Sequence, residues 1–160
     1  CETACIVNAD HPFADAEEMS LEAYLSLPHL SLGSVVRPAF SPIGGRLKQL
    51  GVNRQVALSV PEYALVPPVI ARTDLIFTTA RPYAEFVVDR YPDYDLRVVG
   101  APREFGNMRL YLLWHERAHK SPANRWVRDL IRDVSRRYGA DLQERPTAAG
   151  MAGLAELAAV

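Results

Sequence analysis

The chain has 160 residues, 49% hydrophobic and 23% charged, a composition typical of one folded domain or of one domain with part of another. Its formal net charge of −1, from 18 basic and 19 acidic side chains, provides no basic field that would draw it to nucleic acid or to an anionic membrane. No apolar run approaches the roughly 18 residues of a membrane span, and the two cysteines, Cys1 and Cys5, lack zinc-site or disulfide spacing, which predicts free thiols.

The first half of the chain indicates short strands that alternate with short helices. Residues 3–7 have the composition of a strand that needs sheet neighbours, and because no methionine precedes them we expect a fragment of a longer protein. Ser20 is expected to cap a helix that ends before Pro28. The expected elements are a helix over 21–27, a strand over 29–33, a loop over 34–44, a helix over 46–50 ended by Gly51, a strand over 54–60, and a helix over 62–72 that Pro67 and Pro68 shorten or kink.

The second half continues the same alternation. The apolar, β-branched run 75–79 is typical of a buried strand, and Pro82 suits the first turn of the helix that follows it. Ser121 and Pro122 form a helix start signal, because the hydroxyl can accept from free N–H groups while proline occupies the first helical position. The other expected elements are strands over 96–99 and 108–114, a helix from 122 to about 138, and a loose or weakly helical tail over 145–160.

This order of elements predicts an α/β sandwich with a largely parallel sheet. Ligands of such sheets bind beyond the carboxyl ends of the strands. The turns that follow Gly33, Val60 and Thr79 are therefore the places where we expect a site.

The run His115-Glu116-Arg117-Ala118-His119 matches the HExxH pattern of zinc hydrolases. That chemistry needs both histidines on one face of an α-helix, with the glutamate as base. Here an apolar strand pattern precedes the run and a new helix starts at Ser121, so we expect the run to lie in a connecting loop. A zinc-dependent hydrolase that uses residues 115–119 is the alternative function.

Six sequence blocks, each weak alone, are specific in their order and spacing. They are DHPFA at 10–14, LPHL at 27–30, LGVNRQVALSVP at 50–61, TDLI at 73–76, LLWH at 112–115 and PANRWVR at 122–128. Through them the sequence resembles the effector-binding domain of LysR-type transcriptional regulators over nearly all of residues 5–138. Within that family it is most similar to the branch that senses aromatic acids, nitroaromatics and flavonoids.

The resemblance implies an α/β fold of the periplasmic-binding-protein type 2 kind, with one complete α/β subdomain and the closing strand and helix of the other. By that template, residues 1–8 are a crossover strand, 9–106 the second effector-binding subdomain, 107–138 the return strand and helix of the first subdomain, and 139–160 a C-terminal tail. A periplasmic binding protein, the third hypothesis, is disfavoured because no signal sequence is visible.

The family's function implies a small-molecule effector, bound in the cleft between the subdomains, and neither catalysis nor a cofactor. The full-length protein would bind DNA through an N-terminal winged helix-turn-helix that this chain lacks. It would be a cytoplasmic homo-oligomer that does not bind a membrane.

The resemblance also implies which side chains contact the effector. His29 matches an effector-contact position of the aromatic-sensing branch, although a strand histidine satisfied by the backbone is an equal alternative. Glu62 stands where that branch often has histidine; a carboxylate there would repel an anionic aromatic acid and suit a phenol, an amine, or a ligand bridged by water or a cation. Its alternative role is an exposed glutamate in the first helical turn. The residues predicted to contact the effector are His29, Ser31, Glu62, Tyr63, Thr78 and Thr79.

Overall fold

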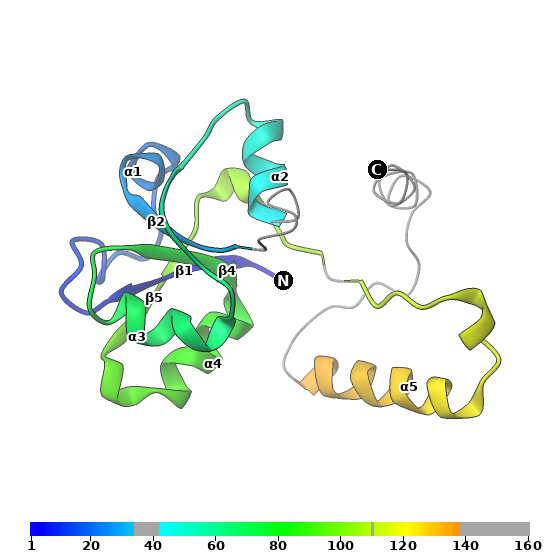
Figure 1. The fold of residues 1–160 in the computed structure, drawn as a ribbon. Coiled ribbons are helices and arrows are strands. Elements are labelled where there is room, and N and C mark those ends of the chain that lie inside the picture. Colours follow the sequence, from blue (N-terminus) through cyan, green and yellow to red (C-terminus); the bar gives the residue numbers. More distant parts are fainter. Residues whose placement is uncertain (34–41, 110, 138–160) are drawn as a thin grey trace. The chain divides into compact units, whose positions relative to one another are not determined.

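The computed structural model describes residues 1–33, 42–109 and 111–137 (Figure 1). The chain divides into two compact units, unit 1 over Cys1–Met108 and unit 2 from Arg109 onward. Each unit is described by itself below. No helix among the described residues is long and apolar enough to span a membrane.

Unit 1 is built on a five-stranded sheet with the strand order β3-β2-β4-β1-β5. The strands are β1 (Thr3–Asn8), β2 (Pro28–Leu32), β3 (Gln55–Val60), β4 (Ile76–Ala80) and β5 (Leu96–Gly100). β2 runs parallel to β3 and β4, as the sequence predicts. β1 departs from the predicted arrangement and runs antiparallel to both β4 and β5. The first residue of β1, Thr3, lies opposite the last residue of β4, Ala80, so the chain enters the sheet at the end where β4 leaves it.

Helices cover both faces of this sheet. α1 (Leu21–Ser26) and α2 (Pro42–Gln49) pack on one face, and α3 (Val66–Ile70) and α4 (Arg81–Arg90) on the other (Figure 1). Short 3-10 turns complete the unit: η2 (Tyr63–Leu65), η3 (Pro92–Tyr94) and η4 (Arg103–Phe105). The mixed α/β architecture expected from the sequence is confirmed.

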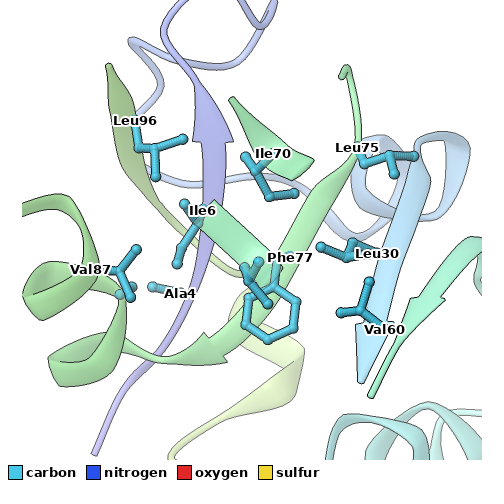
Figure 2. Close-up of a cluster of buried hydrophobic side chains, with 11 residues drawn as sticks. Ala4, Ile6, Leu30, Val60, Ile70, Leu75, Phe77, Val87 and Leu96 are labelled. Carbon is cyan, nitrogen blue, oxygen red and sulfur yellow. The ribbon is translucent and has the colours of Figure 1, made fainter. Parts of the chain in front are cut away.

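The core of unit 1 has two halves because successive side chains of a strand point to opposite faces. Ala4 and Ile6 of β1 join Phe77 of β4 in the cluster under α3 and α4, which Figure 2 shows in close-up. Cys5 and Val7 lie in the cluster under α1 and α2. Each fully buried Ile, Leu or Phe side chain stabilises the fold by roughly 1.5–3 kcal/mol, so the central strands are held from both sides.

Several local signals act as the sequence predicts. The Ser20 Oγ accepts a hydrogen bond from the Ala23 N–H at 3.1 Å and caps α1. Gly51 has a φ of 69°, the left-handed conformation expected after α2. Pro67 and Pro68 divide the predicted helix into the turn η2 and the five-residue α3.

One predicted boundary and one predicted strand are wrong. α2 begins at Pro42, inside the predicted loop over 34–44, because proline is tolerated in the first helical turn and two exposed glycines weaken but do not prevent a helix. The predicted strand over 108–114 is irregular at each of its described residues. A strand needs a paired neighbour for its backbone groups, and none of the described strands pairs with this segment.

Unit 2 contains the turn η5 (Glu116–Ala118) and the helix α5 (Pro122–Arg137). α5 begins at the predicted Ser121-Pro122 signal, where the Asn124 N–H donates to the Ser121 Oγ at 3.4 Å. The Arg128 guanidinium donates to the carbonyls of Ala118 and His119 at 3.1 and 2.9 Å and lies 4.8 Å from the centre of the Trp114 ring. These contacts hold η5 against α5. The predicted tail over 139–160 lies outside the described residues.

The two ends of unit 1 are hydrogen-bonded to each other. The Met108 N–H donates to the Cys1 carbonyl at 2.7 Å, and the Cys1 amino group donates to the Met108 carbonyl at 2.9 Å. The chain therefore enters and leaves unit 1 at one point.

We expect opposite effects from two glycine substitutions around α2. Gly51→Ala forces a side chain into the left-handed region and should lower the free energy of unfolding by about 1 kcal/mol. Gly45→Ala, in the exposed part of α2 with open space around its Cβ position, should raise it by about 0.5–1 kcal/mol. Urea denaturation measures both, and a loss of stability in both variants would contradict the assignment of α2.

Candidate functional site

The structure separates the six predicted effector contacts into two groups. His29 and Ser31 of β2 and Thr78 of β4 point to the α1 and α2 face, because the residues between them contribute to the opposite cluster. Glu62 and Tyr63 follow β3, and Tyr63 packs edge-on against Phe77 on the α3 and α4 face. Thr79 alternates with Thr78 and therefore points to that second face, where it is buried.

The first group belongs to a set of polar side chains beneath α1, called the polar cluster below: Cys5, Tyr24, His29, Ser31, Arg54 and Thr78. Tyr24 is fully buried at its centre, with its Oη 2.7 Å from the Thr78 Oγ1. The Arg54 Nη1 donates to the Tyr24 Oη at 3.0 Å, which leaves the phenol proton free to point at Thr78. The Arg54 Nη2 donates to the Ser31 Oγ at 3.5 Å.

His29 is a neutral imidazole in the polar cluster. Burial and the positive charge of Arg54 lower the pKa of His29 to about 4. The His29 Nε2 lies 2.9 Å from the Tyr24 carbonyl oxygen and must carry the ring proton, because a carbonyl only accepts. The Nδ1 is thus a bare acceptor, and it is buried with no hydrogen-bond partner among the described residues. The sequence offered a histidine satisfied by the backbone as the alternative. This describes Nε2, which has a backbone partner, but not Nδ1, which has none among the described residues.

Burial makes the other titratable members of the polar cluster still harder to ionise. It raises the pKa of the Cys5 thiol to about 12, against smaller opposing effects of Thr78 and Arg54. Burial also raises the pKa of the Tyr24 phenol. At neutral pH, Arg54 is therefore the one charged side chain of the polar cluster.

Tyr63 forms part of an exposed aromatic surface on the opposite face of the sheet. It is 51% exposed, and its ring packs edge-on against Tyr83 with 4.9 Å between the ring centres. Phe86 extends the surface from Tyr83 along α4 and is 48% exposed. Glu62 directly precedes η2 as an exposed residue, and its side chain makes no capping hydrogen bond.

A hollow of about 320 Å³ opens where β4 and β5 end and β1 begins. Two ion pairs lie at its walls: the Arg81 Nε with the Glu2 Oε2, and the Arg103 Nε with the Glu18 Oε1, each at 2.8 Å. The hollow lies at the carboxyl ends of strands, where ligands of α/β sheets bind. None of the six predicted contacts lines it.

The HExxH run occupies a connection, as the sequence predicts. The His115 Nδ1 accepts from the Arg117 N–H at 3.1 Å, and Glu116–Ala118 form a 3-10 turn. The His119 Nδ1 accepts from the Trp114 Nε1 at 3.2 Å. The two histidines therefore do not share the α-helical face that zinc ligation by this pattern requires.

Sequence reasoning missed Tyr24 and Arg54, which organise the polar cluster. Tyr24 is 30 residues from Arg54 along the chain, and only the packing of α1 on the sheet brings them together. Arg54 lies just before β3, within the LGVNRQVALSVP block. The block indicates the family, but it does not predict which side chains Arg54 donates to.

Comparisons with known proteins agree on one family. A family model described as the LysR substrate binding domain matches residues 1–136. The chain is 32% identical over 127 residues to the HTH-type transcriptional regulator SyrM of Rhizobium meliloti, a match of 79% of this chain and 38% of that protein. It is 27% identical over 130 residues to the HTH-type transcriptional activator NahR of Pseudomonas putida, covering 81% of this chain and 42% of NahR. The chain thus spans about two fifths of these relatives.

Solved structures show the same fold. The regulatory domain of MexT, a transcriptional activator in Pseudomonas aeruginosa, matches with a TM-score of 0.54 and 21% identity over 81% of this chain and 61% of that one. The effector-binding domain of QuiR, solved in complex with shikimate, matches with a TM-score of 0.57 and 12% identity over 85% of this chain and 62% of that one.

We expect the buried His29 to make the protein sensitive to acid. Its pKa lies below the 6.5 of a free histidine, so the unfolded chain binds the proton more tightly. Stability should be unaffected by this group above pH 6.5 and should fall by roughly 2–3 kcal/mol between pH 6.5 and 4. Urea denaturation across this range measures the fall. His29→Gln should show a shallower fall, and an identical pH profile would contradict the buried neutral imidazole.

We expect the HExxH run to bind no stoichiometric zinc, because its histidines lie on a 3-10 turn and not on an α-helix. Metal analysis of the purified chain checks this. One equivalent of zinc that is lost in both His115→Ala and His119→Ala, with a hydrolytic activity lost in parallel, would restore the hydrolase hypothesis.

Proposed function

The chain belongs to the LysR substrate-binding domain family, and from that premise we propose that it is the effector-sensing region of a LysR-type transcriptional regulator. The family match over residues 1–136 is the observation that carries the proposal. The relatives are named as helix-turn-helix regulators, and this chain matches about two fifths of them. The remainder of such a protein would hold the winged helix-turn-helix that binds DNA.

The whole regulator would be a cytoplasmic homo-oligomer that binds its effector without converting it. A small molecule that favours one arrangement of the two subdomains would change how the oligomer presents its DNA-binding parts. QuiR, whose domain has the same fold, was solved with a small molecule bound, which supports a sensing role for this architecture.

Within the chain, the template assigns 1–8 to a crossover strand, 9–106 to the second subdomain, 107–138 to the return strand and helix of the first, and 139–160 to the tail. The division of the chain into compact units after Met108 supports a boundary near this position. The sheet of unit 1, covered on both faces, supports the assignment of a complete subdomain.

The six predicted residues lie in two groups on opposite faces of the sheet, so one small effector would contact one group or the other. His29, Ser31 and Thr78 offer hydroxyl groups and an open imidazole nitrogen in the polar cluster. Tyr63 offers an exposed ring next to Tyr83, which suits an aromatic ligand. Small-molecule sites combine such an apolar wall with a few polar groups.

We expect the chain to bind a member of a panel of phenols, aryl amines, aryl carboxylates and flavones, and Glu62→His to change the order of preference. The substitution replaces an acceptor that carries negative charge with a ring that can donate. Isothermal titration calorimetry measures the affinities, with Glu85→His on the exposed face of α4 as the matched control. Equal affinities in wild type and Glu62→His across the panel would remove Glu62 from the site, and no binding by any member would count against the function.

A further inference from the structure

Unit 2 contains a hydrogen bond between two side chains of the connection that leads into α5. The Trp114 Nε1–H donates to the His119 Nδ1 at 3.2 Å. The two rings are nearly coplanar, with 12° between their planes and 6.2 Å between their centres. An imidazole nitrogen accepts a hydrogen bond only when it carries no proton. The arrangement therefore requires a neutral His119 ring with its proton on Nε2.

The guanidinium of Arg128 holds both partners of this hydrogen bond against α5. It lies 4.8 Å from the centre of the Trp114 ring, and its Nη2 donates to the carbonyl of His119 at 2.9 Å. Arg128 is 7% exposed, so water screens its charge less than it would screen a fully exposed arginine. A proton on the His119 ring would add a second positive charge to this small group of side chains.

The other titratable and charged groups near His119 are exposed. On the connection itself they are His115, Glu116, Arg117 and Lys120. Water and salt screen charges at such positions over about 8–10 Å. On α5, Arg128 is the charged side chain that is hydrogen-bonded to the connection. The carboxylates of α5 pair with arginines of the same helix, Asp129 with Arg132 and Asp133 with Arg136.

We propose that the hydrogen bond from Trp114 to His119 is a proton-sensitive contact, which closes the connection at neutral pH and opens it in acid. Histidine is the side chain whose charge ordinarily changes between pH 5 and 8. A proton on the His119 Nδ1 would face the Trp114 N–H, so that a donor would meet a donor and the hydrogen bond would break. The indole N–H would then turn to water, and the Arg128 hydrogen bonds alone would hold η5 against α5.

The size of this effect follows from the exposure of the contact. Trp114 is 38% exposed, so water can replace His119 as the acceptor once the hydrogen bond is broken. The net stabilisation by one neutral hydrogen bond corresponds to a factor of about two to ten between the closed and the open form. Acid should therefore loosen the turn before α5 without unfolding the helix.

The indole N–H signals in NMR spectra of the isotope-labelled chain, recorded from pH 8 to pH 5, test the proposal. The chain has two tryptophans, and Trp126, which is 66% exposed, is the internal reference. We expect the Trp114 signal to move with the same midpoint as the ring protons of His119. We also expect the Trp114 N–H to exchange with water about two- to tenfold faster at the acid end, relative to Trp126 at the same pH.

Two substitutions separate His119 from the other histidines. His119→Asn keeps an acceptor oxygen in the side chain and removes its titration, so the Trp114 signal should no longer respond to pH. His115→Asn is the matched control, because His115 and His119 are the only histidines of the sequence from residue 109 onward. The Trp114 response should persist in this control. The remaining two histidines, His11 and His29, belong to unit 1.

A Trp114 signal that does not titrate in the wild-type chain, that titrates equally in His119→Asn, or that loses its response in His115→Asn would each overturn the proposal. If His119→Asn does not fold, the wild-type midpoints decide. A Trp114 midpoint that agrees with His119 and differs from His115 supports the contact, and one that agrees with His115 alone overturns it. None of these outcomes bears on effector binding, so the proposed function would stand in each case.

Discussion

Strand β4 is covered on both faces, and this constraint determines where polar side chains of unit 1 can lie. Ile76 and Phe77 enter opposite core clusters, and Thr78 follows in the layer beneath α1. A hydroxyl in such a layer must find a partner or weaken the fold. The Tyr24 phenol is the hydrogen-bond partner of Thr78 and accepts a hydrogen bond from Arg54. These hydrogen bonds join α1 to β4 and to the residue that precedes β3.

The same arrangement explains the charge states in the polar cluster. Burial raises the pKa values of the Tyr24 phenol and the Cys5 thiol, and burial together with the nearby guanidinium lowers the pKa of His29, so that its imidazole stays neutral. The positive charge of Arg54 thus remains without a negative counterpart in the described part of the chain. The ion pairs around the hollow at the strand ends show the opposite arrangement, because there each guanidinium lies against a carboxylate.

Much of the fold could be predicted because its signals are local. The Ser20 cap, the Gly51 turn and the Ser121-Pro122 start each depend on a few neighbouring residues, and each is confirmed. The antiparallel direction of β1 depends on where the chain enters the sheet, which no short window contains. The polar cluster depends on residues as far apart as Cys5 and Thr78, and periodicity places each of them on a face without naming its partner. The effector roles of the six predicted residues remain predictions.

The hydrogen bonds between Cys1 and Met108 have a consequence for the way such a unit can be used by evolution or in engineering. A folded body whose entry and exit points touch can be inserted into a loop of another protein without stretching the host. A force on the chain at Cys1 or at Met108 would act on the same part of unit 1, which lies next to the start of β1 and beyond the end of β5. Unit 1 therefore has the geometry of a domain that can be moved as one piece into another protein, because its two ends are already joined by hydrogen bonds.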